Sequence, residues 1–145
     1  MPERETLERA RKDAREGKSP STQAGEFVRE EIHHVREGRH GARSPQQAIA
    51  IGLSKARRAG VKLRLPAGSP SVRKKAAQDS KKGKTRNHKT SGKRSRAVFG
   101  ALRRESRRAA SHEALSRQAS ESAVRHGKQK RKQAVVKAAP SHRAA

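Results

Sequence analysis

The sequence Ser-Pro-Gln-Gln-Ala-Ile-Ala-Ile-Gly-Leu-Ser-Lys-Ala-Arg-Arg-Ala-Gly-Val-Lys-Leu occupies residues 44–63 and decides the fold class. Ser44 stands at an N-cap position, Pro45 at the first helical position and Gln47 three residues after the cap, which is a capping-box pattern. Apolar side chains recur at helical spacing on one face of the segment: Ala48, Ile49, Leu53 and Ala56. We therefore predict a helix over residues 45–59.

A second amphipathic helix is predicted upstream, over residues 22–37. Gly17, Gly38 and Gly60 are placed to end the helices, and Gly52 permits another helix to approach closely. We expect a helical hairpin whose core is formed by Phe27, Val28, Ile32, Val35, Ile49, Leu53 and Val61. A core of this size is marginal, so a homodimer or a ligand would complete it. Residues 3–16 read as a polar helix that is solvated or frayed.

Composition predicts that the rest of the chain is poor in packed structure. The 145 residues carry 38 Lys and Arg against 13 Asp and Glu, a net charge of +25, and only 1% are aromatic. Residues 1–66 hold 15 of the basic and 9 of the acidic residues, whereas residues 67–145 hold 23 and 4. So high a charge with so few large apolar residues is typical of disorder.

The predicted fold class is therefore mainly α, a small helical hairpin followed by a long, largely disordered basic tail with one marginal helical region. We divide the chain into a small helical domain at 1–66, a disordered basic linker at 67–96, a marginal basic helix at 97–126 and a disordered basic tail at 127–145.

Several classes of protein are disfavoured. There is no Cys for a disulfide scaffold, and the longest apolar run, Ala48–Leu53, is far shorter than the ~20 residues of a membrane helix. The N-terminus has no apolar segment typical of a secretory signal, so we expect a cytoplasmic, nucleoid location. The carboxylates lie mostly beside Arg or Lys without the burial that tunes acid–base groups. We predict no enzyme activity, no cofactor and no small-molecule substrate.

The basic runs of residues 67–145 are the candidate functional residues, because Lys and Arg neutralise phosphates and release counterions. The predicted nucleic-acid-binding set is Arg73, Lys74, Lys75, Lys81, Lys82, Lys84, Lys93, Arg94, Arg103, Arg104, Arg107, Arg108, Lys128, Lys130, Arg131 and Lys132. On a helix, Arg103, Arg104, Arg107 and Arg108 would form one ridge. The alternative is that these cations only form a solvated surface.

The aromatic residues favour duplex over single-stranded nucleic acid. Only Phe27 and Phe99 are present, and each lies in an apolar helical pattern that predicts packing rather than base stacking. Ser19-Pro20 and Ser44-Pro45 are predicted to start helices. Ser69-Pro70, followed by three basic residues, resembles the Ser-Pro turns of linker-histone tails. We thus expect duplex DNA binding without sequence preference.

Two further patterns resemble a metal site and a phosphate-binding loop. Glu31, His33, His34, Glu37 and His40 could be drawn as a metal site, but no further His or Cys lies at ligand spacing, so we predict a solvated or phosphate-contacting cluster and no metal. The segment 83–85 reads Gly-Lys-Thr like a phosphate loop, but residue 78 is Gln where that loop requires Gly.

The core Gln-Ala-Ile-Ala-Ile-Gly-Leu-Ser-Lys-Ala-Arg at residues 47–57 resembles a bacterial family of small basic proteins. Residues 18–32 and 111–119 resemble the longer members of that family. The family is catalogued as a domain of unknown function, with some members labelled plasmid-stabilisation or DNA-binding proteins. The resemblance implies no catalytic residues.

Three rival functions have distinct tests. An RNA- or ribosome-associated protein would prefer structured RNA to duplex DNA. A protein-interaction module would retain its partner without residues 67–145. A basic amphipathic segment on anionic membranes ranks last, because the apolar faces are short and lack Trp.

Overall fold

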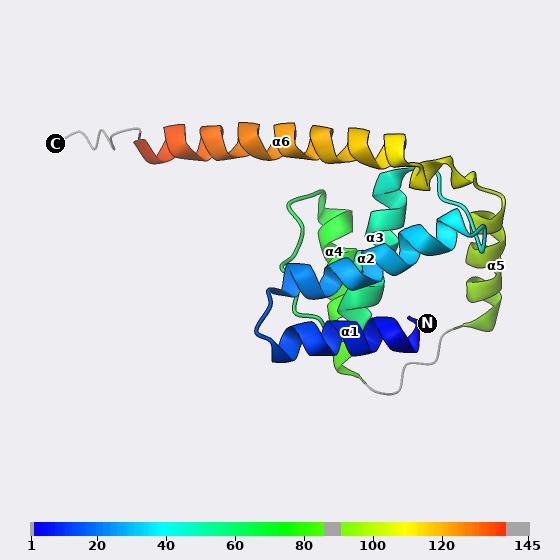
Figure 1. Ribbon diagram of the computed structural model, residues 1–145. Helices are drawn as coiled ribbons and strands as arrows, with labels where there is room; N and C mark the ends of the chain where they lie inside the picture. Colours follow the sequence, from blue (N-terminus) through cyan, green and yellow to red (C-terminus); the bar gives the residue numbers. More distant parts are fainter. Residues whose placement is uncertain (1, 86–90, 139–145) are drawn as a thin grey trace.

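The structure is a computed structural model that describes residues 2–85 and 91–138, with residues 134–138 described by their backbone alone. Figure 1 shows a body of helices from which one long helix extends. The elements in chain order are α1 (Arg4–Arg15), α2 (Pro20–Arg36), α3 (Pro45–Arg58), α4 (Pro70–Lys84), α5 (Gly92–Arg103), the short 3-10 helix η1 (Arg107–Ala110) and α6 (His112–Ala138).

Three helices begin in the same way. Ser19-Pro20, Ser44-Pro45 and Ser69-Pro70 stand at equal spacing along the chain, with Ser at the N-cap of α2, α3 and α4 and Pro at the first helical position. The hydroxyls of the first two accept from the backbone N–H of Thr22 and Gln47, each at 3.2 Å. The expected helix starts at Ser19-Pro20 and Ser44-Pro45 are confirmed, and α2 begins two residues before the predicted range of 22–37. The histone-tail interpretation of Ser69-Pro70 is wrong, because this pair also begins a helix.

The α2–α3 pair forms the centre of the body. A Cβ atom at Gly52 would lie 2.7 Å from the Cα of Val28, so the predicted close approach at this glycine is confirmed. Gly17, Gly38 and Gly60 take φ values of 72°, 77° and 98° after α1, α2 and α3, which confirms them as helix ends.

The first helix is packed rather than frayed. Thr6 and Ala10 of α1 are buried against α2, and Arg9 reaches Glu26 of α2 with Nε 2.7 Å from a carboxylate oxygen. The expectation of a solvated α1 is wrong because the small side chains of Thr6 and Ala10 let α1 and α2 pack closely.

Two small apolar clusters form the core. One cluster joins Ala10, Ala24, Phe27 and Ala56, with Leu7, Leu53, Val61 and Leu63 against it. The other joins Val35, Ala42, Ala48, Ala109 and Ala110, with Ile32 against it. Of the predicted core residues, Val28 lies beside Gly52, and Ile49 is half-buried in a groove described below.

A hairpin with a long disordered tail is the wrong description of this chain. The segment predicted as a disordered linker contains α4, whose Ala76 and Asp79 are buried against α3. The Asp79 carboxylate accepts from the Ser54 hydroxyl at 2.7 Å. A Cβ at Gly83 would lie 2.3 Å from the carbonyl oxygen of Arg57, so the two backbones touch.

The predicted marginal helix at 97–126 is instead divided between three elements. The chain turns between α5 and η1, and Ala109 and Ala110 of η1 fill the cluster around Val35. The backbone N–H of Gly41 donates to the Leu102 carbonyl at 2.9 Å, and that of Ala42 to the Ser106 carbonyl at 3.0 Å. These bonds attach the turn to the body.

The last described element, α6, begins within the predicted marginal helix and continues through residues expected to be a disordered tail. Residues 139–145 of that tail lie outside the described residues. The helix is stabilised along its exposed length by the pairs Glu113–Arg117 and Glu121–Arg125, at 2.7 and 3.4 Å. Composition does not record such pairs, because they depend on the spacing of Glu and Arg along the helix.

Candidate nucleic-acid interface

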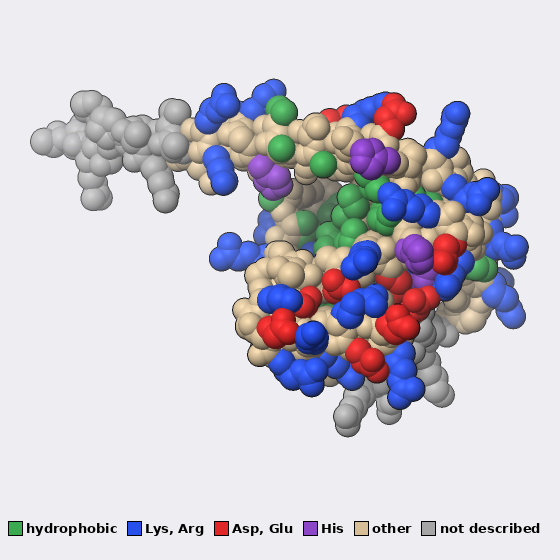
Figure 2. All heavy atoms as spheres, in the orientation of Figure 1, with side chains coloured by type: hydrophobic (Ala, Val, Ile, Leu, Met, Phe, Trp, Pro, Cys, Tyr) green, Lys and Arg blue, Asp and Glu red, His purple; other side chains and the backbone are tan. Residues whose placement is uncertain are grey.

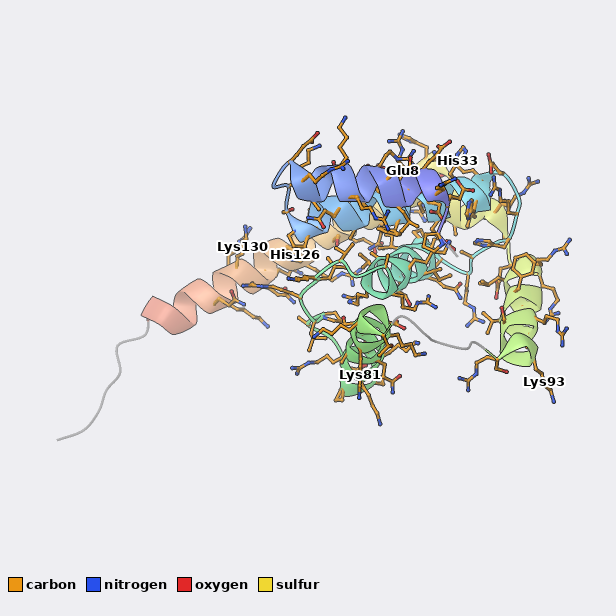
Figure 3. All side chains as sticks on the ribbon, turned by 90° about the horizontal axis from the view of Figure 1, so that it is seen from below. Glu8, His33, Lys81, Lys93, His126 and Lys130 are labelled. Carbon is orange, nitrogen blue, oxygen red and sulfur yellow. The ribbon has the colours of Figure 1, made fainter. Side chains whose placement is uncertain are left out.

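Acidic side chains are concentrated on one side of the body. The acidic residues of the N-terminal half gather on α1 and α2, where they form ion pairs such as Arg9–Glu26, Lys18–Asp13 and Arg39–Glu3. Figure 2 shows red side chains concentrated over these two helices and blue ones around them. In Figure 3, Glu8 and His33 lie on one side and Lys81 and Lys93 on the other.

Most cations of the predicted nucleic-acid set lack acidic partners, whereas Arg4, Arg9 and Lys12 of α1 each pair with a Glu. Lys75 pairs with Asp79 at 3.2 Å. The other members have no carboxylate within ion-pair distance in the part of the chain that the structure describes. Lys82 is half-buried, and the rest of the set is exposed. Positive charge is therefore available to an external polyanion.

The set is distributed over four elements, α4, α5, η1 and α6, rather than one surface. Lys81 of α4 and Lys93 of α5 lie on the side of the body away from α1, whereas Lys130 lies on the projecting part of α6 (Figure 3). Arg96 of α5, which the predicted set omits, is exposed on the same helix as Lys93 and Arg94. Its position in the sequence between Lys93-Arg94 and Arg103-Arg104 could have identified it as a further candidate.

The predicted ridge of four arginines does not form. Arg103 ends α5, Arg104 is its C-cap, and Arg107 and Arg108 belong to η1. The guanidinium of Arg107 lies over Gly38 at the end of α2, within 3.0 Å of where a Cβ would stand. The turn at residues 104–106 separates the two pairs because η1 must bring its alanines to the core.

The two phenylalanines have opposite environments. Phe27 is 1% exposed in the core, whereas Phe99 on α5 is 48% exposed. The prediction that Phe99 packs is wrong: none of the described α5 side chains is buried. The Cζ atom of Arg103 lies 5.9 Å from the Phe99 ring centroid, a cation–π distance.

An apolar groove of about 770 Å³ lies between α3, α4, α5 and α6. Apolar side chains line most of it: Ile49, Ile51, Leu53, Val72, Ala76, Val98 and Leu102. Figure 2 shows hydrophobic side chains in the hollow beneath α6. Arg57 also lines the groove; it is 8% exposed, and its Nε has no hydrogen-bond partner among the described residues.

The His and Glu residues considered as a metal site belong to a polar network. Glu31, His34 and His40 are buried, with candidate ligand atoms within 4.8 Å of one another. His40 Nε2 lies 3.2 Å from Glu31, and the Lys55 ammonium lies 2.7 Å from the other Glu31 oxygen. His33 and Glu37 instead pair with each other on the exposed surface.

Arg39 and Lys55 supply positive charge to the carboxylates of this network. His34 Nε2 lies 3.0 Å from Glu3, whose carboxylate also accepts from Arg39. The hydrogen bonds with His34 and Arg39 lower the pKa of Glu3 below its ordinary value. The prediction of a solvated His cluster is wrong for His34 and His40, because the network is buried and joins α1, α2 and α3.

Comparison with protein-family models, with curated proteins and with solved structures finds no match to this chain. The family resemblance at residues 47–57 therefore stays an expectation. Within the described residues, no helix is both long and apolar enough to cross a membrane.

Proposed function

We propose that this protein binds the phosphate backbone of duplex nucleic acid, most favourably duplex DNA, without reading its sequence. The exposed cations of α4, α5 and α6 would contact phosphates, as in a nucleoid-associated or linker-histone-like accessory protein. The observation that carries the proposal is the distribution of acidic side chains: they gather on α1 and α2, whereas α4 has the single acidic residue Asp79, α5 has none, and most cations of α4 and α5 are exposed.

The arrangement favours binding through charge rather than base recognition. Lys and Arg contacts to phosphates fix position on a duplex but carry no sequence information. Helix α4 presents Arg73, Lys74 and Lys81, and Gln78 is the single amide side chain of this helix that could contact a base edge. The projecting α6 would place Lys128 and Lys130 on phosphates beyond those reached by the body.

A triple substitution on α4 tests the proposal. Arg73→Gln, Lys74→Gln and Lys81→Gln together remove three exposed cations that have no acidic partner in the described structure. Fluorescence anisotropy with a labelled duplex of random sequence should show affinity reduced on the order of tenfold, equally for unrelated sequences.

The matched control removes the same amount of charge from the acidic side. Arg11, Arg15 and Arg29 are exposed on α1 and α2, so their replacement by Gln also changes the net charge by three. This control should retain nearly all affinity. Equal losses in the two triple variants would contradict the proposed surface, and no duplex binding by the parent chain would contradict the function.

The groove supports a second candidate function, docking of a partner protein. Its lining is mostly apolar, and the buried Arg57 guanidinium has no hydrogen-bond partner for its Nε among the described residues. An interaction module of this kind would bind its partner unchanged in the α4 triple variant, whereas Ile51→Asp at the groove would abolish binding. RNA binding through the same cations is separated from DNA binding by competition between hairpin RNA and duplex DNA.

A further inference from the structure

The Phe99 face of α5 is left unused by both the core and the groove. Val98 and Leu102 line the groove, but Phe99 is not among its lining residues. Phe99 is 48% exposed, and the described structure places only the Arg103 guanidinium over its ring. Figures 1 and 3 both show α5 at the edge of the body. A large aromatic ring is thus held open to solvent on a basic helix.

Cations flank this ring along the helix. Arg96 precedes Phe99 by three residues and Arg103 follows it by four, so the three side chains share one face of α5. The two guanidinium-bearing residues are about 10 Å apart along the helix axis. The sequence of α5 contains no Asp or Glu. The ring is therefore bordered by positive charge on both sides.

We propose that Phe99 is a stacking platform for an unpaired base, with Arg96 and Arg103 contacting the phosphates on either side of that nucleotide. The proposal rests on the proposed nucleic-acid binding and adds a ligand class to it: a duplex that carries a single-stranded end or gap. Exposed aromatic rings in a basic surface bind unpaired bases because every base offers a π face, which a closed duplex hides within its stack. The cation–π contact with Arg103 holds the ring and leaves about half of its surface available.

A protein-docking role for this face is the competing explanation, and the charge pattern disfavours it. The apolar part of the face is a single ring between two arginines, whereas Val98 and Leu102 are directed to the groove. A protein partner needs a broader apolar contact than one ring supplies. A single nucleotide matches the size and charge of this site.

Affinity measurements with two DNA probes provide the test. The probes are a blunt duplex and the same duplex with a single-stranded oligothymidine overhang. The parent chain should bind the overhang probe more tightly. Phe99→Ala should reduce affinity for that probe by roughly 5- to 150-fold, the range measured for loss of one base–aromatic stack, and leave blunt-duplex affinity unchanged.

Val98→Ala is the matched control. Val98 is 54% exposed on the same helix and lines the groove, so its truncation should not change the preference for the overhang. Phe99→Leu keeps much of the apolar area and removes the π face; it should behave like Phe99→Ala. Preference for the overhang that survives both Phe99 substitutions would overturn the platform.

A direct readout is available because the chain has no Trp and no Tyr. Phe99→Trp places the only indole on the proposed platform, and stacking of thymine should quench its fluorescence when the overhang probe is added but not when the blunt duplex is added. Equal quenching by both probes, or none by either, would overturn the inference. If the parent binds neither probe, the proposed function fails as well. If it binds both equally, only the platform fails.

Discussion

Removing the Asp79 carboxylate tests whether α4 is a docked helix. Asp79 is 2% exposed, accepts from the Ser54 hydroxyl at 2.7 Å, and has Lys75 Nζ at 3.2 Å and Arg58 Nε at 3.8 Å. Asp79→Ala deletes these contacts and leaves two cations without their acidic partner. A hydrogen bond to a charged group contributes about 1.5–3 kcal/mol, so we expect the free energy of unfolding to fall by about 2–3 kcal/mol.

Thermal unfolding followed by far-UV circular dichroism measures this change. For a chain of about 150 residues, 1 kcal/mol shifts Tm by roughly 2–4 °C, so Tm should fall by about 5–10 °C. Glu121→Ala is the matched control, because it makes the same charge change on the exposed surface of α6, where the described structure pairs Glu121 with Arg125 alone, at 3.4 Å. Its effect should stay within about 0.5 kcal/mol.

The comparison has a clear refuting result. If Asp79→Ala and Glu121→Ala have the same Tm, the carboxylate does not fix α4 to α3, and residues 70–84 behave as the linker that composition predicts. A double-mutant cycle with Ser54→Ala adds a second check, since a direct hydrogen bond gives a coupling energy of about 0.5–3 kcal/mol between the two substitutions.

Three further predictions concern the body. Gly52→Ala should lower the free energy of unfolding, measured by urea titration, by about 1–3 kcal/mol, because its Cβ would lie 2.7 Å from the Val28 Cα. Gly25→Ala is the control: its Cβ meets nothing within 4 Å, so the free energy of unfolding should rise by about 0.5–1 kcal/mol. Gly41→Ala should lower Tm by separating the loop from the Glu105 carbonyl, which lies 1.9 Å from the added Cβ; an unchanged Tm would contradict that contact. Burial raises the pKa of Glu30, but hydrogen bonds from the Glu3 backbone, Thr6 and Lys55 outweigh it, so its folded pKa lies below 4.5. The contribution of Glu30 to the free energy of unfolding should therefore be fully present above pH 4.5 and be lost as the pH drops through the folded pKa. In Glu30→Gln the free energy of unfolding should decrease less steeply over the same pH range.

The helix starts and stops were predictable because they depend on local chemistry. Ser44-Pro45 and Gly38 specify a start and a stop whatever surrounds them, and Gly52 indicated a close helix crossing. The packing of α4 was not predictable from composition, since it depends on one carboxylate, one hydroxyl and a glycine that meet only in three dimensions. A count of large apolar residues underestimates a core built largely from alanine.

The candidate interface was partly predictable. Exposure of the basic residues follows from their abundance, because few acidic residues exist in residues 67–145 to pair with them. The exposure of Phe99 could not be predicted from the sequence, since an apolar helical pattern does not show whether another helix packs against it. The break between Arg104 and Arg107 depended on the core position of the η1 alanines.

The salt dependence of duplex binding tests the central claim most directly. Affinity of the full chain, measured by anisotropy, should fall by about 10³–10⁵ between about 50 and 200 mM salt if 6–10 phosphates are contacted. The α4 triple variant should have a log–log slope shallower by about 2.7, and the α1–α2 triple variant should keep the parent slope. An affinity that hardly changes with salt, or equal slopes for the parent and the α4 variant, would contradict phosphate binding by this surface.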